Sequence, residues 1–175
     1  AHSNYLLLRA ERGQARTAGS IYEQADATSL VLCQGEETLV PDTGFGSWKN
    51  RQTTSHHKAH SLVLINGLPA PPVKGILQAG ASVDVDVAIT DLVLKQEISA
   101  ARVNRQFGGA VFERTVVFAD KRDFFVFDRV TAQQGSHDFT WLLHLNAGGT
   151  TGGTLRLRGS RAQVVRPKAR LGIYL

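Results

Sequence analysis

Polar side chains that can bind a metal ion or an acidic sugar gather between residues 22 and 67. They lie at the edges of two apolar runs, 29–33 and 61–67, and comprise Gln24, Asp26, Asp42, Arg51, His56, His57 and His60. Three of the six histidines of the chain fall within five residues. A packed β-domain has little structural use for that density of imidazole, so the cluster indicates metal binding, recognition or catalysis.

An amide, a carboxylate and an imidazole form the candidate set of metal ligands: Gln24, Asp42 and His60. Zinc accepts His and Asp, whereas an amide oxygen suits calcium or another hard ion better, so both metals remain candidates. Asp42 lies between Pro41 and Gly44 in a tight reversal, where an aspartate also commonly caps backbone amides. His60 opens an apolar run, where a histidine also serves as an ordinary surface or core residue. A metal-binding role and a purely structural role therefore stay open for both.

Three residues close to this set are candidates for binding a substrate: Trp48, Arg51 and His57. The guanidinium of Arg51 can hold a carboxylate through two hydrogen bonds, and the flat face of Trp48 can carry a sugar ring. The alternative is a solvated loop with a tryptophan that packs. No nucleophile-elbow motif is present, and the carboxylate pair of a glycoside hydrolase cannot be identified from this pattern.

Length and composition indicate one globular domain. A chain of 175 residues is long enough for one core and short for two, and 42% hydrophobic with 20% charged residues is ordinary. The net charge of +5 favours a polyanionic partner or simply a soluble basic surface. Lys and Arg are scattered singly without a nucleic-acid-binding motif, so no nucleic acid is expected. No apolar run approaches the ~20 residues of a membrane helix, so no membrane partner is expected either.

Strand-like runs rich in Val, Leu, Phe and Thr follow one another along the chain, separated by polar, Gly-rich turns. Between residues 83 and 89 the odd positions are Val or Ile and the even positions are Asp or Ala, a period of two that is typical of antiparallel sheets. Residues 116–128 predict a hairpin around the polar connection 119–123. We therefore expect an all-β fold, an antiparallel β-sandwich or barrel, without a helix of ordinary length.

Both ends of the chain indicate a piece of something longer. The chain contains no methionine, so residue 1 is not expected to be a translation start. The chain ends inside the strand-like run 170–175, where an edge leaves backbone groups unpaired unless more chain follows or another chain covers it. We interpret residues 1–175 as one domain that is incomplete at its C-terminal end.

The motifs around the polar cluster resemble the β-sandwich domain of heparinase II/III-like polysaccharide lyases. In that family a His-x-His/Gln-x-Asp motif with a following Ser comes first. A strand that ends in Asp-x-Gly follows it. A third segment is a strand that begins with His and ends near Asn/Asp-Gly. The matching pieces here are residues 22–26 with Ser29, residues 42–44 and residues 60–67. Downstream, 112–130 and 140–146 are similar to the family's Arg-containing hairpin and the aromatic strand that follows.

The resemblance implies a larger enzyme, in which an N-terminal toroid of helices packs against this sandwich and an acidic polysaccharide lies in the cleft between them. It implies a lyase that removes the C5 proton of a uronic acid and expels the 4-O-linked sugar through an enolate-like intermediate. It also implies a divalent metal, held by Gln24, Asp42 and His60, that ties the loops together, and a periplasmic or secreted location.

Tyr22 departs from the family pattern, in which the first motif residue is usually a histidine near the reacting sugar. As the catalytic candidate of this chain, a tyrosine can donate a proton, but its ordinary pKa of about 10 makes it a poor base. The family's catalytic tyrosine and its partner lie in the toroid, so this chain alone is expected to be inactive. The alternative function is a non-catalytic module for acidic-glycan binding or assembly that kept the fold and lost the chemistry.

Overall fold

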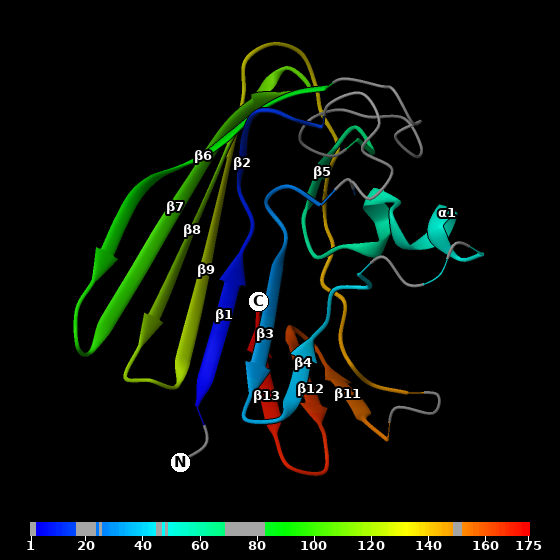
Figure 1. Ribbon diagram of the computed structural model, residues 1–175, viewed down its shortest axis with the longest axis vertical. Helices are drawn as coiled ribbons and strands as arrows, with labels where there is room; N and C mark the ends of the chain where they lie inside the picture. Colours follow the sequence, from blue (N-terminus) through cyan, green and yellow to red (C-terminus); the bar gives the residue numbers. More distant parts are fainter. Residues whose placement is uncertain are drawn as a thin grey trace.

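The structure is a computed structural model that describes residues 3–16, 24, 26–44, 47, 49–68, 83–148 and 152–175 (Figure 1). As the sequence predicts, the fold is all-β, apart from two short helical turns, α1 (Arg51–Thr54) and η1 (His57–Ala59). The strands of the described residues are β1 (Asn4–Leu8), β2 (Glu11–Arg16), β3 (Leu30–Gln34), β4 (Glu37–Val40), β5 (Val63–Ile65), β6 (Val83–Leu94), β7 (Ile98–Phe107), β8 (Ala110–Ala119), β9 (Asp123–Ala132), β10 (Phe139–Trp141), β11 (Thr154–Arg158), β12 (Arg161–Val165) and β13 (Arg170–Tyr174).

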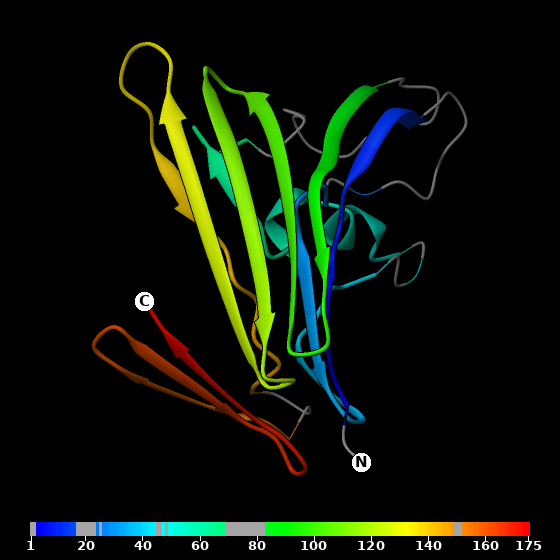
Figure 2. The same cartoon turned by 90° about the vertical axis from the view of Figure 1, so that its left-hand side faces the viewer.

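All strand pairs of the described residues are antiparallel and form four sheets. The largest has the order β2-β6-β7-β8-β9, and the others are β1-β3-β4, β5-β10 and β11-β12-β13. Figure 2 shows the large sheet as one layer with the other strands packed behind and below it. The run that contains β1 and β2 switches sheets, since β1 pairs with β3 whereas β2 pairs with β6. This switch joins the two layers at one edge.

The main core lies between the β1-β3-β4 sheet and the β9 side of the large sheet. Its buried residues are Leu30, Leu32, Leu39, Val40 and Ala169, with Leu6, Phe124, Val126, Leu143, Leu145 and Leu171 packed against them. Two sheets that face each other across such a core make a β-sandwich, so the predicted architecture is confirmed.

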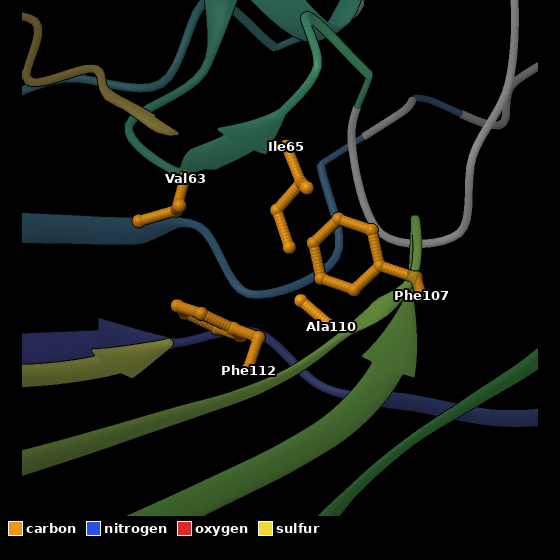
Figure 3. Packing of buried hydrophobic residues seen from close by; sticks show 5 residues of the cluster. All are labelled: Val63, Ile65, Phe107, Ala110 and Phe112. Atoms are coloured by element: carbon orange, nitrogen blue, oxygen red, sulfur yellow. The ribbon is translucent and has the colours of Figure 1, made fainter. Parts of the chain in front are cut away.

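A second cluster holds β5 against the hairpin that connects β7 and β8. Val63 and Ile65 of β5 face Phe107, Ala110 and Phe112 (Figure 3). The hairpin turn consists of Gly108 and Gly109, with φ of 59° and 77°, and a Cβ on Gly109 would lie 2.9 Å from Cε1 of His137. Glycine is therefore needed here both for the turn and for the close approach of neighbouring segments. The packing fixes the strand that directly follows His60.

The strand boundaries agree with the sequence in most places and differ in a few. The predicted hairpin around 119–123 is confirmed. Ala119 pairs with Asp123, and within the three-residue connection Asp120 and Lys121 adopt positive φ of 52° and 53°. The apolar runs 82–90 and 92–98, which predict separate strands, instead fall largely in the single long strand β6, which bulges between Ile89 and Asp91. The polar strand β2 was not predicted.

No helix in the described part of the chain has the length and hydropathy needed to cross a membrane. The proline-rich segment 66–75 is too short for a linker between domains and predicts a crossing loop, but it lies mostly outside the described residues.

Candidate metal centre

Three segments that are separate in the sequence bring Asp26, Asp42 and His60 together. One potential ligand atom from each residue lies within 4.8 Å of the others. Asp26 precedes β3, Asp42 follows β4, and His60 lies between η1 and β5. Because β3 pairs with β4, and the Leu30 amide donates to the Ser61 carbonyl at 3.2 Å, the three segments meet at one end of the β1-β3-β4 sheet.

Asp42 makes two hydrogen bonds that together explain its position. Its Oδ1 accepts a bond from the Gly44 amide at 2.9 Å, and its Oδ2 lies 2.7 Å from Nδ1 of His60. The first bond is the backbone cap that the sequence offered as the structural alternative, so that prediction is confirmed. The second bond joins the other oxygen of the same carboxylate to His60. The structural role of Asp42 as a cap and its candidate role as a metal ligand therefore do not exclude each other.

The pKa of Asp42 lies below its ordinary value. Burial alone would raise this pKa, but the hydrogen bonds from His60 and the Gly44 amide, and the charges of His60 and Arg9, outweigh burial. The carboxylate is therefore ionised at neutral pH, which is the form that binds a metal ion.

Asp26 is a carboxylate of the cluster that the predicted ligand set did not include. Its side chain is buried, and its Oδ2 lies 3.1 Å from Nη1 of Arg9. Its carbonyl accepts a bond from the Ser29 amide, which closes a turn in which Thr28 has a φ of 74°. The signal for Asp26 was in the sequence, two residues after Gln24. Arg9 carried no such signal, because its contact arises only from the path of the chain between β1 and β2.

Two further polar atoms at these residues are buried and lack a hydrogen-bond partner in the described structure: Nε2 of His60 and Oε1 of Gln24. Gln24 is two residues from Asp26, so their Cα atoms are at most about 7 Å apart. Buried polar atoms normally have a partner, and a missing ion is one cause of an unsatisfied group. Carboxylate and amide oxygens with an imidazole nitrogen form a mixed set that zinc or calcium accepts, so the residues present fit a divalent ion.

Arg114 of β8 ties this end of the sandwich to the large sheet. Its side chain is completely buried and binds Asp128 of β9 through Nε and Nη2, both at 2.7 Å. Its Nη1 donates to the Thr28 carbonyl at 2.5 Å and to the Ser61 carbonyl at 3.3 Å. Thr28 and Ser61 follow Asp26 and His60 by two residues and one residue, so Arg114 positions both segments of the cluster.

The remaining predicted site residues are only partly within the described structure. Tyr22 and Trp48 lie outside the described residues, and Arg51 begins α1, where only its backbone is described. His57 is 4% exposed, and its ring centroid lies 4.0 Å from that of His56. Burial, followed by the charges of His56 and Lys58, lowers the pKa of His57 to about 4. His57 is therefore a neutral, packed imidazole at neutral pH, and its substrate-binding role stays a prediction.

The sequence of the chain matches the model of the family "Heparinase II/III-like, C-terminal" over residues 2–174. Because this match covers nearly the whole chain, the protein belongs to the heparinase II/III-like C-terminal family. No curated protein matches the chain.

Solved structures of heparinases have a similar fold. A mutant of the heparan sulfate lyase HepC from Pedobacter heparinus is 15% identical, with a TM-score of 0.71, and the match covers 98% of this chain and 25% of that one. The heparinase III BT4657 gene product is 12% identical, with a TM-score of 0.69, over 90% of this chain and 23% of that one. The chain thus spans about a quarter of the length of the solved structures that it matches.

Replacing Arg114 should destabilise the sandwich strongly. In Arg114→Met the Asp128 carboxylate and the buried carbonyls of Thr28 and Ser61 lose their hydrogen-bond donor, which is expected to lower the free energy of unfolding by about 1–3 kcal/mol. Urea unfolding measures the loss, and Arg129→Met, which removes an exposed arginine of β9, is the control, with an expected change within about 0.5 kcal/mol. Equal losses in the two variants would contradict the role given to Arg114.

His57 should make stability decline in mild acid. Its pKa of about 4 in the folded chain lies below the ordinary 6.5, so the unfolded chain takes up the proton first. The stabilisation is complete above pH 6.5 and is lost as the pH falls towards 4, by up to about 3 kcal/mol. Urea midpoints at several pH values in this window should fall less steeply in His57→Gln than in the parent chain. His56→Gln removes only the second cause of the shift and should keep most of the decline, because burial of His57 is the larger cause. A parallel decline in all three proteins would refute the assignment.

Proposed function

We propose that this chain is the β-sandwich domain of a polysaccharide lyase, and that its parent protein cleaves a uronic-acid-containing polysaccharide by β-elimination. The family match over residues 2–174 carries the proposal. The structural likeness to proteins named as heparan sulfate lyases supports the same class. In this proposal an N-terminal helical domain of the same protein forms the other wall of the cleft, and the polysaccharide lies between the two.

The contribution of this chain is to present polar side chains to the cleft from the segment between Asp42 and His60. Both ends of that segment are held, by the Asp42–His60 hydrogen bond and by the bond from the Thr43 hydroxyl to the Thr54 carbonyl at 2.9 Å. The backbone of Arg51 lies within this braced segment. We assign the neutralisation of the uronate carboxylate to Arg51, because a guanidinium can bind a carboxylate bidentately and stabilise the enolate that develops from it.

The proposed metal site consists of Gln24, Asp42 and His60, with Asp26 as an additional carboxylate. The mutual approach of Asp26, Asp42 and His60 within 4.8 Å supports it, as do the unpartnered buried atoms of His60 and Gln24. A divalent ion, zinc or calcium, would offset the charge of the two carboxylates and hold their loops together. The reaction itself is assigned to side chains of the cleft, with Tyr22 and Trp48 as the candidates on this chain for the proton and for the sugar ring.

A non-catalytic acidic-glycan-binding module is the second candidate, and Tyr22 is the observation that favours it. A tyrosine stands where the family usually has a histidine near the reacting sugar, so the chain can have kept the fold without the chemistry. Either function places the parent protein in the periplasm or outside the cell, because intact polysaccharides are found there.

Purified without chelator, the chain should contain about one divalent ion per molecule. Elemental analysis should find zinc or calcium, and a chelator should lower the Tm because the buried carboxylates then lose their ligand. Asp42→Asn and His60→Gln should each reduce the metal content severalfold. Asp138→Asn and His56→Gln are the matched controls, because neither residue belongs to the proposed ligand set, and both variants should retain the metal. Metal-free protein with an unchanged Tm would leave Asp42 and His60 as residues that only brace the loop.

The chain alone should not cleave polysaccharide, whereas its full-length parent should. Incubation with alginate or heparan sulfate, followed by ultraviolet absorbance of the unsaturated product, measures both. Turnover by the chain alone would place the active site within the sandwich. Tight glycan binding without turnover by the full-length protein would favour the binding module over the lyase.

A further inference from the structure

The C-terminal sheet carries positive charge that lies outside the candidate metal centre. Residues 139–175 hold six of the twenty Lys and Arg residues of the chain and none of the fifteen Asp and Glu residues. Because the net charge of the chain is +5, these six charges leave residues 1–138 with a net charge of −1. The positive excess of the protein is therefore concentrated after residue 138.

Strand pairing collects four of these arginines on one face of the β11-β12-β13 sheet. Arg158 lies opposite Arg161, and Arg161 lies opposite Tyr174. Cross-strand partners, and alternate residues along each strand, share a face. We call this surface the arginine face; its members are Thr154, Arg156, Arg158, Arg161, Gln163, Val165, Arg170, Gly172 and Tyr174.

The arginine face points away from the core. The opposite face of the sheet consists only of Leu, Ala, Val and Ile side chains: Leu155, Leu157, Ala162, Val164, Leu171 and Ile173. Val164 is completely buried and Leu171 packs against the main core, so the apolar face is turned inwards at β12 and β13, whereas Leu155 and Leu157 of the edge strand β11 are exposed. The four arginines are exposed. Both views show this sheet at the lower end of the molecule, below β5 and α1 (Figures 1 and 2).

The four arginines lack acidic partners among the described residues, unlike the other two cations of the segment. Arg166 binds Glu37 at 2.8 Å and Lys168 binds Glu36 at 2.5 Å. Arg158 and Arg161, in contrast, are directly opposite each other, where Cβ atoms are about 5 Å apart and like charges destabilise a sheet. Such a pair costs stability in the free chain, and an anion that bridges it offsets that cost.

We propose that the arginine face binds an anionic polysaccharide as a site separate from the lyase cleft. Guanidinium groups bind carboxylate and sulfate groups through two parallel hydrogen bonds, and alternate arginines about 7 Å apart on a strand can contact successive charged groups of one glycan. The site would hold a long substrate while the cleft acts on another part of it.

The choice of a glycan over a nucleic acid rests on the proposed function and on the composition of the face. Binding of single-stranded nucleic acid relies on aromatic rings on which successive bases stack. The arginine face offers one ring, Tyr174, and the guanidinium of Arg161 already lies over it at 5.4 Å from the centroid.

The test measures binding of labelled heparan sulfate, alginate and single-stranded DNA oligomers of similar charge to the 175-residue chain, by fluorescence anisotropy at several salt concentrations. We expect at least one of the two glycans to bind. Binding of heparan sulfate alone would indicate recognition of sulfate groups, whereas binding of alginate as well would indicate recognition of carboxylates. Arg158→Ser with Arg161→Ser should weaken glycan binding at least tenfold and reduce the salt dependence by about two released ions. The Tm of this variant should change little, because the repulsive pair is removed together with the favourable contact between Arg161 and Tyr174.

Lys121→Ser with Arg129→Ser is the matched control, since it removes two exposed cations from β9 and its turn. It should keep glycan binding within about twofold of the parent chain. Equal losses in the two double variants, preferential binding of DNA, or no glycan binding at low salt would overturn the proposal. Glycan binding through the arginine face by a full-length protein without turnover would instead reject the lyase and leave this site standing.

Discussion

The buried guanidinium of Arg114 is the constraint on which the polar end of the sandwich depends. A charge without solvent costs several kcal/mol unless its hydrogen bonds are satisfied, so the chain must bring acceptors to it. Asp128 supplies two from the neighbouring strand, and the carbonyls of Thr28 and Ser61 supply the others. These carbonyls belong to the segments that carry Asp26 and His60. The geometry of the candidate metal centre is therefore set by a residue that is not one of its ligands.

The strands were predictable where local chemistry and the final fold agree. The hairpin of β8 and β9 combines two apolar runs with a connection that tolerates positive φ at Asp120 and Lys121, so its signal is local. Strand β2 has no such signal: Glu11–Arg16 is polar and contains glycine, and it is a strand because β6 offers it an edge. The two helical turns, α1 and η1, are too short to show helical periodicity in the sequence.

The candidate site was predictable in part for a similar reason. Asp42 and His60 stand out because each follows or precedes an apolar run, and they lie 2.7 Å apart in the structure. The pairing of β3 with β4 and the backbone bond between Leu30 and Ser61 create this proximity, and neither is visible in spacing alone. Arg9 reaches Asp26 because β1 pairs with β3, and so its contact required the tertiary structure.

The candidate metal centre and the arginine face differ in whether their charged side chains have partners of opposite charge. At the candidate metal centre Asp26 lies against Arg9 and Asp42 lies against His60, so each carboxylate has a basic neighbour before any ion binds. On the C-terminal sheet the arginines that are scattered singly in the sequence become a continuous surface only through strand register. No described carboxylate offsets them there, and the repulsion between Arg158 and Arg161 persists in the free chain. The exposed arginines of this sheet thus lack the acidic neighbours that the buried Arg114 has in Asp128, and an anionic partner would offset this imbalance of charge.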